Sequence, residues 1–453
     1  MPDAELLAQL RELLGERGVR EEPHLLWPDT VLKPETTEQV SAVLKLCNAA
    51  GQALIPWAGK TGLVDGLNDT CGELGLSLER MHAVEEIDQL NRTCTVQAGC
   101  ILQVAAEACA EKGLLLPLDL GARGSATVGG NVATNAGGNR VIRYGMMREM
   151  VLGLEVVLAD GTVISSLNKM LKNNTGYDIK QWFIGAEGTL GVITRVVIRL
   201  RPLPRSQNTA LVACNDFDSV TRLLGWLDAN TAGTLSAFEC MWPSFYNYVT
   251  REGSLHRPPL AQVYPFYVLV ETMGSNPEED LDRFEQVLAE ALEQELMVDA
   301  VIAKSQSESN AIWEIRDDVL NFMAQGPAAL FDVSVTIDQI APFLAEVEAF
   351  MNGIPDSYNV TFGHLGDSNL HLILGNTNAD NFDKAHIENS VYALVEKYAG
   401  SVSAEHGIGL AKREHLACSR SAEELQLMYA MKRMLDPNNI LNPNKVFSAD
   451  KVA

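Results

Sequence analysis

The sequence predicts an α+β protein with more than one domain, and three observations support this class. The chain has 453 residues, enough for two or three domains with sizeable cores. Its first half is rich in glycine and in short β-like runs. Residues 208–303 instead alternate strands and helices in an order typical of an antiparallel sheet. Apolar residues make up 47% and charged residues 21%, as in ordinary soluble globular proteins.

We expect four segments along the chain. Residues 1–22 form a helical lead-in. Residues 23–204 form a glycine-rich first domain, which ends where prolines stop a strand. Residues 205–423 form a second domain, and the tail 424–453 begins with an amphipathic helix that Asp436-Pro437 ends.

Two local signals are clear in the first domain. Thr36 is a candidate N-cap for a helix whose apolar positions recur at helical spacing until Gly51. The run 152–165 reads as a β-hairpin, because Asp160-Gly161 between β-compatible residues is a strong two-residue turn signal.

The second domain alternates strands with helices, which favours a ferredoxin-like antiparallel sheet with helices on one face. The expected strands are 209–215, 234–241, 263–272, 297–303 and 329–337, and the expected helices lie near 217–229, 277–292, 306–324 and 341–352.

Charge and composition exclude some partners. The net charge of −24 argues against nucleic acid or an anionic membrane surface as the main partner. No apolar run approaches the roughly 18–20 residues that cross a bilayer. The N-terminus reads as an amphipathic helix rather than a signal peptide, and eight scattered cysteines without CxxC spacing favour reduced core thiols. We therefore expect a cytoplasmic protein without transmembrane segments.

The second half contains a concentration of histidine. In TFGHLGDSNLHLIL (361–374), Gly366-Asp367-Ser368-Asn369 reads as a four-residue hairpin turn, which would place His364 opposite His371. Directly opposed residues have Cβ atoms about 4.5–5.5 Å apart, close enough for two imidazoles to share an ion. Two facing histidines can equally be ordinary sheet residues.

A second motif, SVSAEHGIG (401–409), adds Glu405 and His406 about thirty residues later. With the two hairpin histidines these side chains could converge on one divalent metal or on one hydroxyl-bearing substrate.

Two glycine-rich stretches, 56–66 and 120–138, form the other strong feature. Glycine lets the backbone approach a ligand closely, so successive N–H groups can cradle a phosphate. The alternative is a pair of tight turns in a β-rich domain. Two such loops favour a cofactor with a pyrophosphate, but neither is a Walker A motif, and no GxGxxG follows a strand and opens a helix.

Two long runs carry a resemblance to a known family. Residues 116–145 and 173–194 resemble the FAD-linked oxidoreductases of the vanillyl-alcohol oxidase and p-cresol methylhydroxylase type, and within them the D-2-hydroxy-acid dehydrogenases. The resemblance extends over about 23–447. It implies an FAD-binding domain of two α+β subdomains (23–204), a substrate or cap domain with a metal site (205–423), and a C-terminal segment that returns to the FAD domain (424–453).

The resemblance also implies residue roles. FAD contacts are assigned to residues of the two glycine-rich stretches and their surroundings: Trp57, Gly59, Lys60, Thr61, Gly62, Leu63, Pro117, Asp119, Ser125, Thr127, Gly130, Asn131, Ala133, Gly138, Ile193 and Asn442. Some relatives attach FAD through a histidine near the first loop. Neither loop contains one here, so we expect non-covalent FAD.

The family's GHxGDxNxH and EHG motifs assign a divalent metal, zinc with manganese as the alternative, to His364, His371 and Glu405. The same resemblance makes His406 the base for the substrate hydroxyl and Arg316 the clamp for the substrate carboxylate. A surface ion pair is the alternative for Arg316. Such a site would deprotonate the hydroxyl while hydride passes to flavin N5.

The second domain departs from the D-2-hydroxyglutarate pattern at Leu320, Leu330 and Ile373, where the resemblance would place threonine, lysine and asparagine. A second substrate carboxylate would lose these partners, and burying it unpaired is costly. The departures favour a monocarboxylic or more apolar 2-hydroxy acid, unless Lys304 or Arg251 restores the charge.

We therefore expect an FAD-dependent dehydrogenase that oxidises a D-2-hydroxy acid of the D-2-hydroxyglutarate or D-lactate type. The alternatives are an oxygen-using oxidase similar to a glycolate oxidase subunit, an alkyl-transferring flavoenzyme, and a non-catalytic flavin-binding subunit. No haem motif or iron–sulfur cysteine cluster occurs in the sequence. The expected electron acceptor is thus separate, an electron-transferring flavoprotein or a quinone, and a homodimer is the default oligomeric state.

Overall fold

The computed structural model describes residues 3–452, which divide by their contacts into two compact units. Unit 1 comprises the chain up to Gly138, then Gly145–Leu203, and everything from Glu405 onward. Unit 2 comprises Asn139–Tyr144 and Pro204–Ala404. Both units mix helices with sheets, so the α+β class is confirmed. Residues 405–423, which we expected in the second domain, lie in unit 1.

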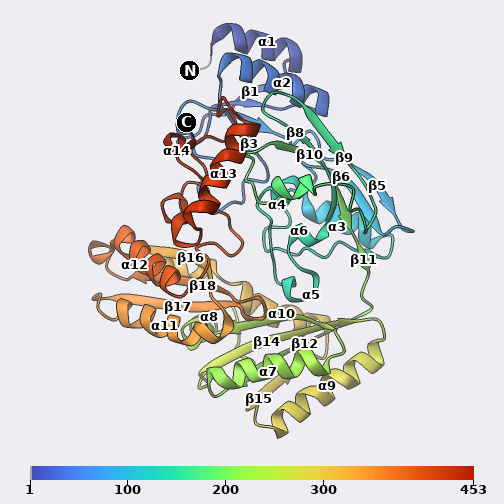
Figure 1. Cartoon of the computed structure of the whole chain (residues 1–453). Helices are drawn as coiled ribbons and strands as arrows, with labels where there is room; N and C mark the ends of the chain where they lie inside the picture. The colour runs from blue at the N-terminus through green and yellow to red at the C-terminus, as the bar shows by residue number, and fades with distance from the viewer. Residues whose placement is uncertain (1–2, 453) are drawn as a thin grey trace. The chain divides into compact units, whose positions relative to one another are not determined.

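Unit 1 is built on two sheets (Figure 1). The four-stranded sheet has the order β1-β2-β4-β3, from strands Val19–Glu21, Thr30–Leu32, Leu74–Ser77 and Leu54–Trp57. The five-stranded sheet has the order β5-β6-β10-β8-β9, from strands Val84–Asp88, Thr93–Gln97, Val192–Arg199, Val151–Val157 and Val163–Ser166. A two-stranded ribbon joins β7 (Leu114–Leu115) to β11 (Arg201–Pro202).

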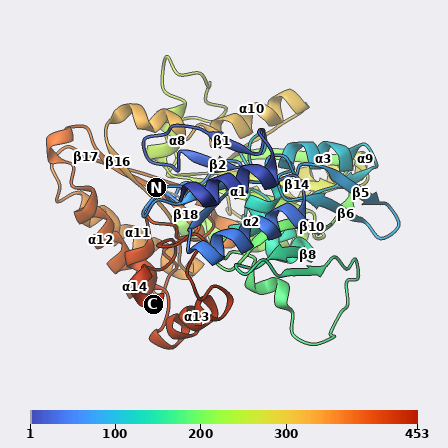
Figure 2. The same cartoon turned by 90° about the horizontal axis from the view of Figure 1, so that it is seen from above.

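Helices and short 3-10 turns connect these strands. They are α1 (Ala4–Leu14), α2 (Thr37–Ala50), α3 (Leu102–Ala110), α4 (Val128–Ala133), α6 (Met147–Met150), η1 (Ile179–Trp182), η5 (Arg413–Cys418), α13 (Ala422–Leu435) and α14 (Ala449–Val452). Helices α1 and α2 lie side by side in both views (Figures 1 and 2).

Two expected local structures of unit 1 are present. The Thr36 side chain accepts the N–H of Gln39 at the start of α2, and Gly51 ends the helix with a left-handed φ of 64°. Strands β8 and β9 form the hairpin expected at 152–165, and Gly161 in its turn has φ +80°.

Unit 2 is organised around one antiparallel seven-stranded sheet with the order β15-β12-β14-β13-β17-β18-β16. Its strands are Asp299–Ile302, Ser206–Cys214, Phe266–Gly274, Leu235–Met241, Ser357–His364, Asn369–Asn376 and Ala328–Ser334. All the expected strands of the second domain are therefore present.

The helical parts of unit 2 are α5 (Val141–Tyr144), α7 (Phe217–Asn230), α8 (Pro243–Val249), α9 (Pro277–Glu293), α10 (Gln306–Asp317), η2 (Leu320–Gln325), α11 (Ile337–Met351), η3 (Leu365–Asp367), η4 (Ala379–Asn381) and α12 (Lys384–Lys397). The helix expected over 306–324 thus ends at Asp317, because Asp318 leaves helical geometry with ψ 56°.

Helices cover both faces of this sheet, whereas we expected them on one. Leu211 and Leu269, register partners on β12 and β14, share a core cluster with residues of α8 and α10. Their chain neighbours point to the opposite face, over which α7 and α9 lie (Figure 1). The face covered by α8 and α10 also carries the histidine hairpin, since Phe362 and Ile373 of β17 and β18 belong to the same cluster.

Candidate active site

The two glycine-rich loops meet in unit 1. The first follows β3, and the second leads into α4, whose N-cap Thr127 accepts the N–H of Gly130. A Cβ on Gly59 would lie 2.1 Å from the carbonyl oxygen of Ser125, and one on Gly130 would lie 2.6 Å from Cβ of Ala58. The loops therefore approach each other more closely than any side chain would permit.

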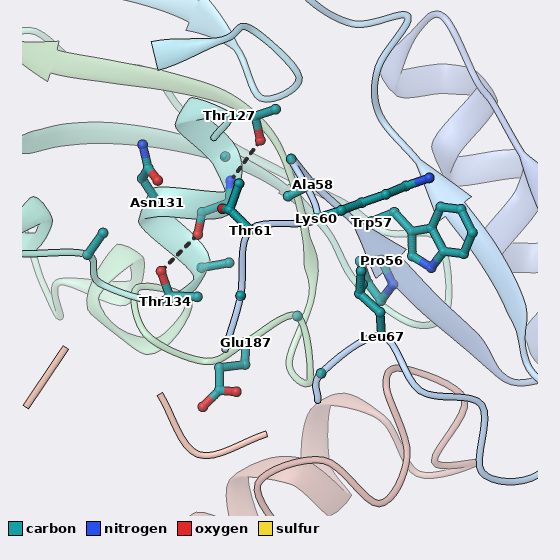
Figure 3. A pocket seen from close by; sticks show the side chains of 18 of the residues that line it. Pro56, Trp57, Ala58, Lys60, Thr61, Leu67, Thr127, Asn131, Thr134 and Glu187 are labelled. Atoms are coloured by element: carbon teal, nitrogen blue, oxygen red, sulfur yellow. Dashed lines mark hydrogen bonds between the residues drawn. The ribbon is translucent and has the colours of Figure 1, made fainter. Parts of the chain in front are cut away.

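The loops line a partly open cavity of about 500 Å³ whose lining residues all belong to unit 1 (Figure 3). Three polar atoms of cavity-lining residues are buried without a hydrogen-bond partner: Nε1 of Trp57, Nδ2 of Asn131 and Oδ1 of Asn442. Buried polar groups normally have partners. This cavity thus offers donors and an acceptor to a large polar ligand, and its close-packed glycine loops suit a pyrophosphate.

Glu405 and His406 line the same cavity. Nε2 of His406 lies 3.5 Å from Oε1 of Glu405. The loop that carries them turns at Gly407 and Gly409, which have φ of +85° and +52° and so use the conformational freedom of glycine. An imidazole and a carboxylate therefore face the ligand space.

Glu187 holds this loop in place, and our sequence reasoning missed it. Its two carboxylate oxygens accept the N–H groups of Ile408 at 2.7 Å and Gly409 at 2.8 Å. Burial raises the pKa of Glu187, while the two hydrogen bonds and Lys412 act in the opposite direction. Glu187 lies in the GAEGTLG stretch, and no local sequence signal connects it with Ile408, which lies 221 residues further along the chain.

In unit 2 the histidine hairpin forms, but with a different register from the expected one. Phe362, not His364, is the partner of His371 on β18, because the turn includes the 3-10 residues Leu365–Asp367. A shift of two residues preserves the face. The rings of His364 and His371 consequently remain neighbours, with centroids 5.3 Å apart.

Asp332 belongs to the same face and was also missed by sequence reasoning. It is the register partner of His371 across β16 and β18, is 1% exposed, and offers a carboxylate oxygen within 4.8 Å of a ring nitrogen of His371. Imidazole and carboxylate groups at this spacing suit a divalent cation.

His364 and Arg316 share a third acidic residue, Glu239 of β13. Its Oε1 lies 2.7 Å from Nδ1 of His364, and its Oε2 accepts Nε–H of Arg316 at 2.8 Å. Although burial alone would raise the pKa of Glu239, the charges and hydrogen bonds of His364 and Arg316 lower it. Arg316, on α10, is thus a buried member of this network rather than a surface ion pair.

Most residues assigned to FAD by resemblance line the cavity: Trp57, Gly59, Lys60, Thr61, Gly62, Leu63, Thr127, Gly130, Asn131, Ala133, Ile193 and Asn442. Pro117, Asp119, Ser125 and Gly138 lie outside its lining. Among the metal and catalytic candidates, His364, His371 and Arg316 lie in unit 2, and Glu405 and His406 lie in unit 1.

Comparison with known proteins identifies the family. The FAD binding domain matches residues 28–166, and the C-terminal domain of FAD linked oxidases matches residues 203–446. The chain belongs to the FAD-linked oxidase family. FAD is therefore its cofactor, as the family resemblance implied, and it contains the pyrophosphate that the glycine-rich loops predicted.

Two curated relatives are similar over most of the chain. It is 40% identical to a mitochondrial D-2-hydroxyglutarate dehydrogenase from Danio rerio over 418 residues, which cover 92% of this chain and 78% of the relative. It is 38% identical to a putative mitochondrial D-lactate dehydrogenase from Schizosaccharomyces pombe over 425 residues, 91% of this chain and 81% of the relative.

The fold matches that of p-cresol methylhydroxylase with substrate bound, with a TM-score of 0.78 at 17% identity, over 98% of this chain and 97% of the other. The expected membership of the FAD-linked oxidases is confirmed by the two family models, and the expected p-cresol methylhydroxylase type of fold is confirmed by the structural match.

The predicted cytoplasmic location is wrong, because these relatives are named as mitochondrial proteins. The cysteine pattern could not distinguish the compartments, since thiols also remain reduced inside other cellular compartments that lack oxidising machinery. Among the described residues, no helix combines the length and apolar character needed to span a bilayer.

Proposed function

We propose that this protein oxidises a D-2-hydroxy acid to the corresponding 2-oxo acid with FAD as oxidant. The observation that carries the proposal is that His406 and Glu405 line the same cavity as the two glycine-rich loops. One cavity thereby brings a candidate base to the cofactor. The names of the two curated relatives support this class of reaction.

In this reaction His406 takes the proton of the substrate hydroxyl on a ring nitrogen. Glu405, 3.5 Å away, stabilises the imidazolium that forms. Arg316 binds the substrate carboxylate through its guanidinium group, whose Nε–H is already directed at Glu239. Bound FAD supplies the two-electron oxidant that accepts hydride from C2.

We further propose a divalent metal, zinc or manganese, held by His364, His371 and Glu405. The two histidines are neighbours on one sheet face, and imidazole with carboxylate is a suitable donor set for either ion. Such a cation would lower the pKa of the substrate hydroxyl. Asp332 is a further candidate ligand because of its position beside His371.

FAD should be bound without a covalent link. The cavity-lining residues within the described chain include no cysteine or tyrosine, and His406 is their single histidine. The electron acceptor should be a separate carrier, either an electron-transferring flavoprotein or a quinone.

The substrate is expected to be a monocarboxylic acid with a short or apolar side chain. Leu330 and Ile373 are register partners one step along the face from Asp332 and His371, and Ile373 packs in the aromatic cluster around Phe362. A second carboxylate would meet apolar groups there. Lys304 and Arg251 are both exposed, but the Arg251 guanidinium lies 3.8 Å from the ring centre of Tyr248, which packs against the same cluster. Arg251 is thus the residue that would restore a charge.

The test is anaerobic mixing of the flavoprotein with D-lactate, larger apolar D-2-hydroxy acids or D-2-hydroxyglutarate. Bleaching of the oxidised flavin band would establish dehydrogenation and rank the acids. His406→Asn should slow bleaching by roughly 10²–10⁴-fold and keep the flavin content. His82→Asn, at an exposed histidine of unit 1, is the matched control. No bleaching with any acid, with or without zinc or manganese, would reject the proposed reaction.

A further inference from the structure

One buried carboxylate joins the two candidate groups of unit 2. Glu239 is 1% exposed and lies opposite His364 in the register of β13 and β17. Each of its oxygens has a different partner, His364 Nδ1 at 2.7 Å and Arg316 Nε at 2.8 Å. A lone buried carboxylate is costly, so both contacts are needed to retain it.

The contact with Glu239 determines which nitrogen of His364 carries the proton. An ionised carboxylate only accepts hydrogen bonds, so Nδ1 must be the protonated nitrogen. The tautomer with Nδ1–H keeps its lone pair on Nε2. Nε2 is therefore the nitrogen of His364 that can ligate a cation.

Arg316 does not compete for this lone pair in the plane of the ring. Its Nη2 is almost equidistant from Nδ1 and Nε2 of His364, at 3.4 and 3.2 Å. An atom in the ring plane at these two distances would overlap with Cε1, the carbon between the two nitrogens. Nη2 therefore lies over the face of the imidazole and directs its N–H at the ring, outside the plane that contains the Nε2 lone pair.

We propose that Glu239 is a positioning residue that fixes the Nδ1–H tautomer of His364 for metal binding and orients Arg316 for the substrate carboxylate. This inference rests on the proposed function, because it concerns the residues that would bind the proposed metal and the substrate carboxylate. Glu239 thereby orients both a proposed metal ligand, His364, and the arginine that would bind the substrate carboxylate, Arg316. Carboxylates that orient a metal-binding histidine in this way are a general device of metal sites.

Glu239→Gln separates this role from a merely structural one. An amide has one acceptor oxygen and one donor group, so it can serve only one of the two donors that Glu239 now accepts. If the amide N–H turns toward His364, the ring takes the opposite tautomer and Nε2 becomes protonated. A side chain of equal size thus changes the tautomer without leaving a cavity.

The experiment is calorimetric titration of the FAD-loaded protein with zinc, accompanied by NMR of isotope-labelled histidine to read the His364 tautomer. We expect Glu239→Gln to weaken zinc binding by roughly 10–100-fold, with mixed His364 tautomers and unchanged flavin content. The matched control is Glu271→Gln, a fully buried carboxylate on the neighbouring strand that pairs with Arg140. It should keep the wild-type zinc affinity and tautomer.

The outcomes remain separable. Unchanged zinc affinity and an unchanged tautomer in Glu239→Gln would overturn the inference while the dehydrogenase proposal stands. If the wild-type protein binds neither zinc nor manganese, the proposed metal fails, and an Nδ1–H tautomer lost in Glu239→Gln would still support the positioning role. Should Glu239→Gln not fold, Glu239→Asp replaces it: its shorter side chain cannot reach both donors, and retention of full zinc affinity would contradict the proposal.

Discussion

Single glycines determine how closely the two glycine-rich loops that line the cavity approach each other. Gly59 has the backbone oxygen of Ser125 where a Cβ would stand, whereas Gly62, three residues along the same loop, has no atom within 4 Å of that position. Both glycines line the cavity. Only the first is required by the protein's own packing, before any ligand is considered.

This difference gives a prediction at the residue scale. Gly59→Ala should destabilise the flavin-free protein by about 1–3 kcal/mol, because the new methyl group meets backbone that cannot rotate away. Gly62→Ala should leave the unfolding midpoint of the flavin-free protein unchanged. Urea unfolding of both variants after flavin removal measures the difference. Equal stabilities would show that the loops are not in the contact described here.

Among the elements, the C-terminal segment is fixed to unit 1 by buried ion pairs. Lys432 of α13 donates to Asp436 and to the carbonyl oxygens of Thr189 and Leu441, and Lys445 pairs with Glu73 where both side chains are fully buried. Removing one partner of such a pair leaves a buried charge and costs about 3–5 kcal/mol. The C-terminal segment after α13, which carries Asn442 to the cavity, is therefore held in place by these ion pairs.

Glu73 makes this attachment dependent on pH. Burial opposes its ionisation, but hydrogen bonds with Asp69, Cys71 and Thr70 and the charge of Lys445 lower its pKa from 4.5 to about 2. A depressed pKa contributes stability above the unfolded value that is lost as the pH falls through the folded value. The contribution is at most about 3 kcal/mol, and Asp69, whose pKa is raised by its burial, offsets part of it.

The expected result is that Glu73→Gln lowers the free energy of unfolding near neutral pH, and that its difference from wild type shrinks as the pH falls from 4.5 toward 2. Urea unfolding at a series of pH values measures this difference. Glu79→Gln, at a side chain that is 54% exposed, should show a small difference throughout. A difference for Glu73→Gln that stays constant with pH would contradict the assignment.

Elements with local signals were predictable from the sequence, and the register of the histidine hairpin was not. The cap at Thr36 and the turn at Asp160-Gly161 depend on neighbouring residues, and both form. The hairpin turn depends on whether Leu365 pairs or enters a 3-10 turn, which packing decides. Because the resulting shift is two residues, His364 and His371 stayed on one face although the expected pairing was wrong.

The carboxylates of the candidate site could not be read from the sequence for a related reason. Glu187, Glu239 and Asp332 lie in glycine-rich or β-like runs far along the chain from their partners, and only the fold brings them together. The histidines and glycines were recognisable because the family motifs are contiguous. Motifs thus reveal the groups that contact a ligand more readily than the groups that hold those side chains in place.

At the scale of the whole molecule, the chain passes between the units four times, and one passage is firmly anchored. The segment Asn139–Tyr144 directly follows the second FAD loop yet belongs to unit 2. Arg140 donates Nε–H and Nη2–H to the two oxygens of Glu271 at 2.9 and 3.2 Å, and Gln207 and Trp313 donate to the same carboxylate. The segment Asn139–Tyr144 is therefore held within unit 2 by a buried ion pair.

FAD should accordingly stabilise the two units unequally. The residues that line the cavity all belong to unit 1. FAD at a hundred times its dissociation constant therefore adds about 2.7 kcal/mol to the free energy of unfolding of that unit. Hydrogen exchange should be measured with and without FAD. The protection that FAD adds should be largest in peptides covering 56–66 and 120–138, and smaller in the strand of unit 2 near 206–214. The added protection should end near residue 139, because the ion pair between Arg140 and Glu271 already restrains the following segment without flavin. Gly59→Ala, with its loops forced apart, should lose most of the protection. Equal protection of both units would mean that flavin binding is coupled to the sheet of unit 2 as strongly as to the glycine loops.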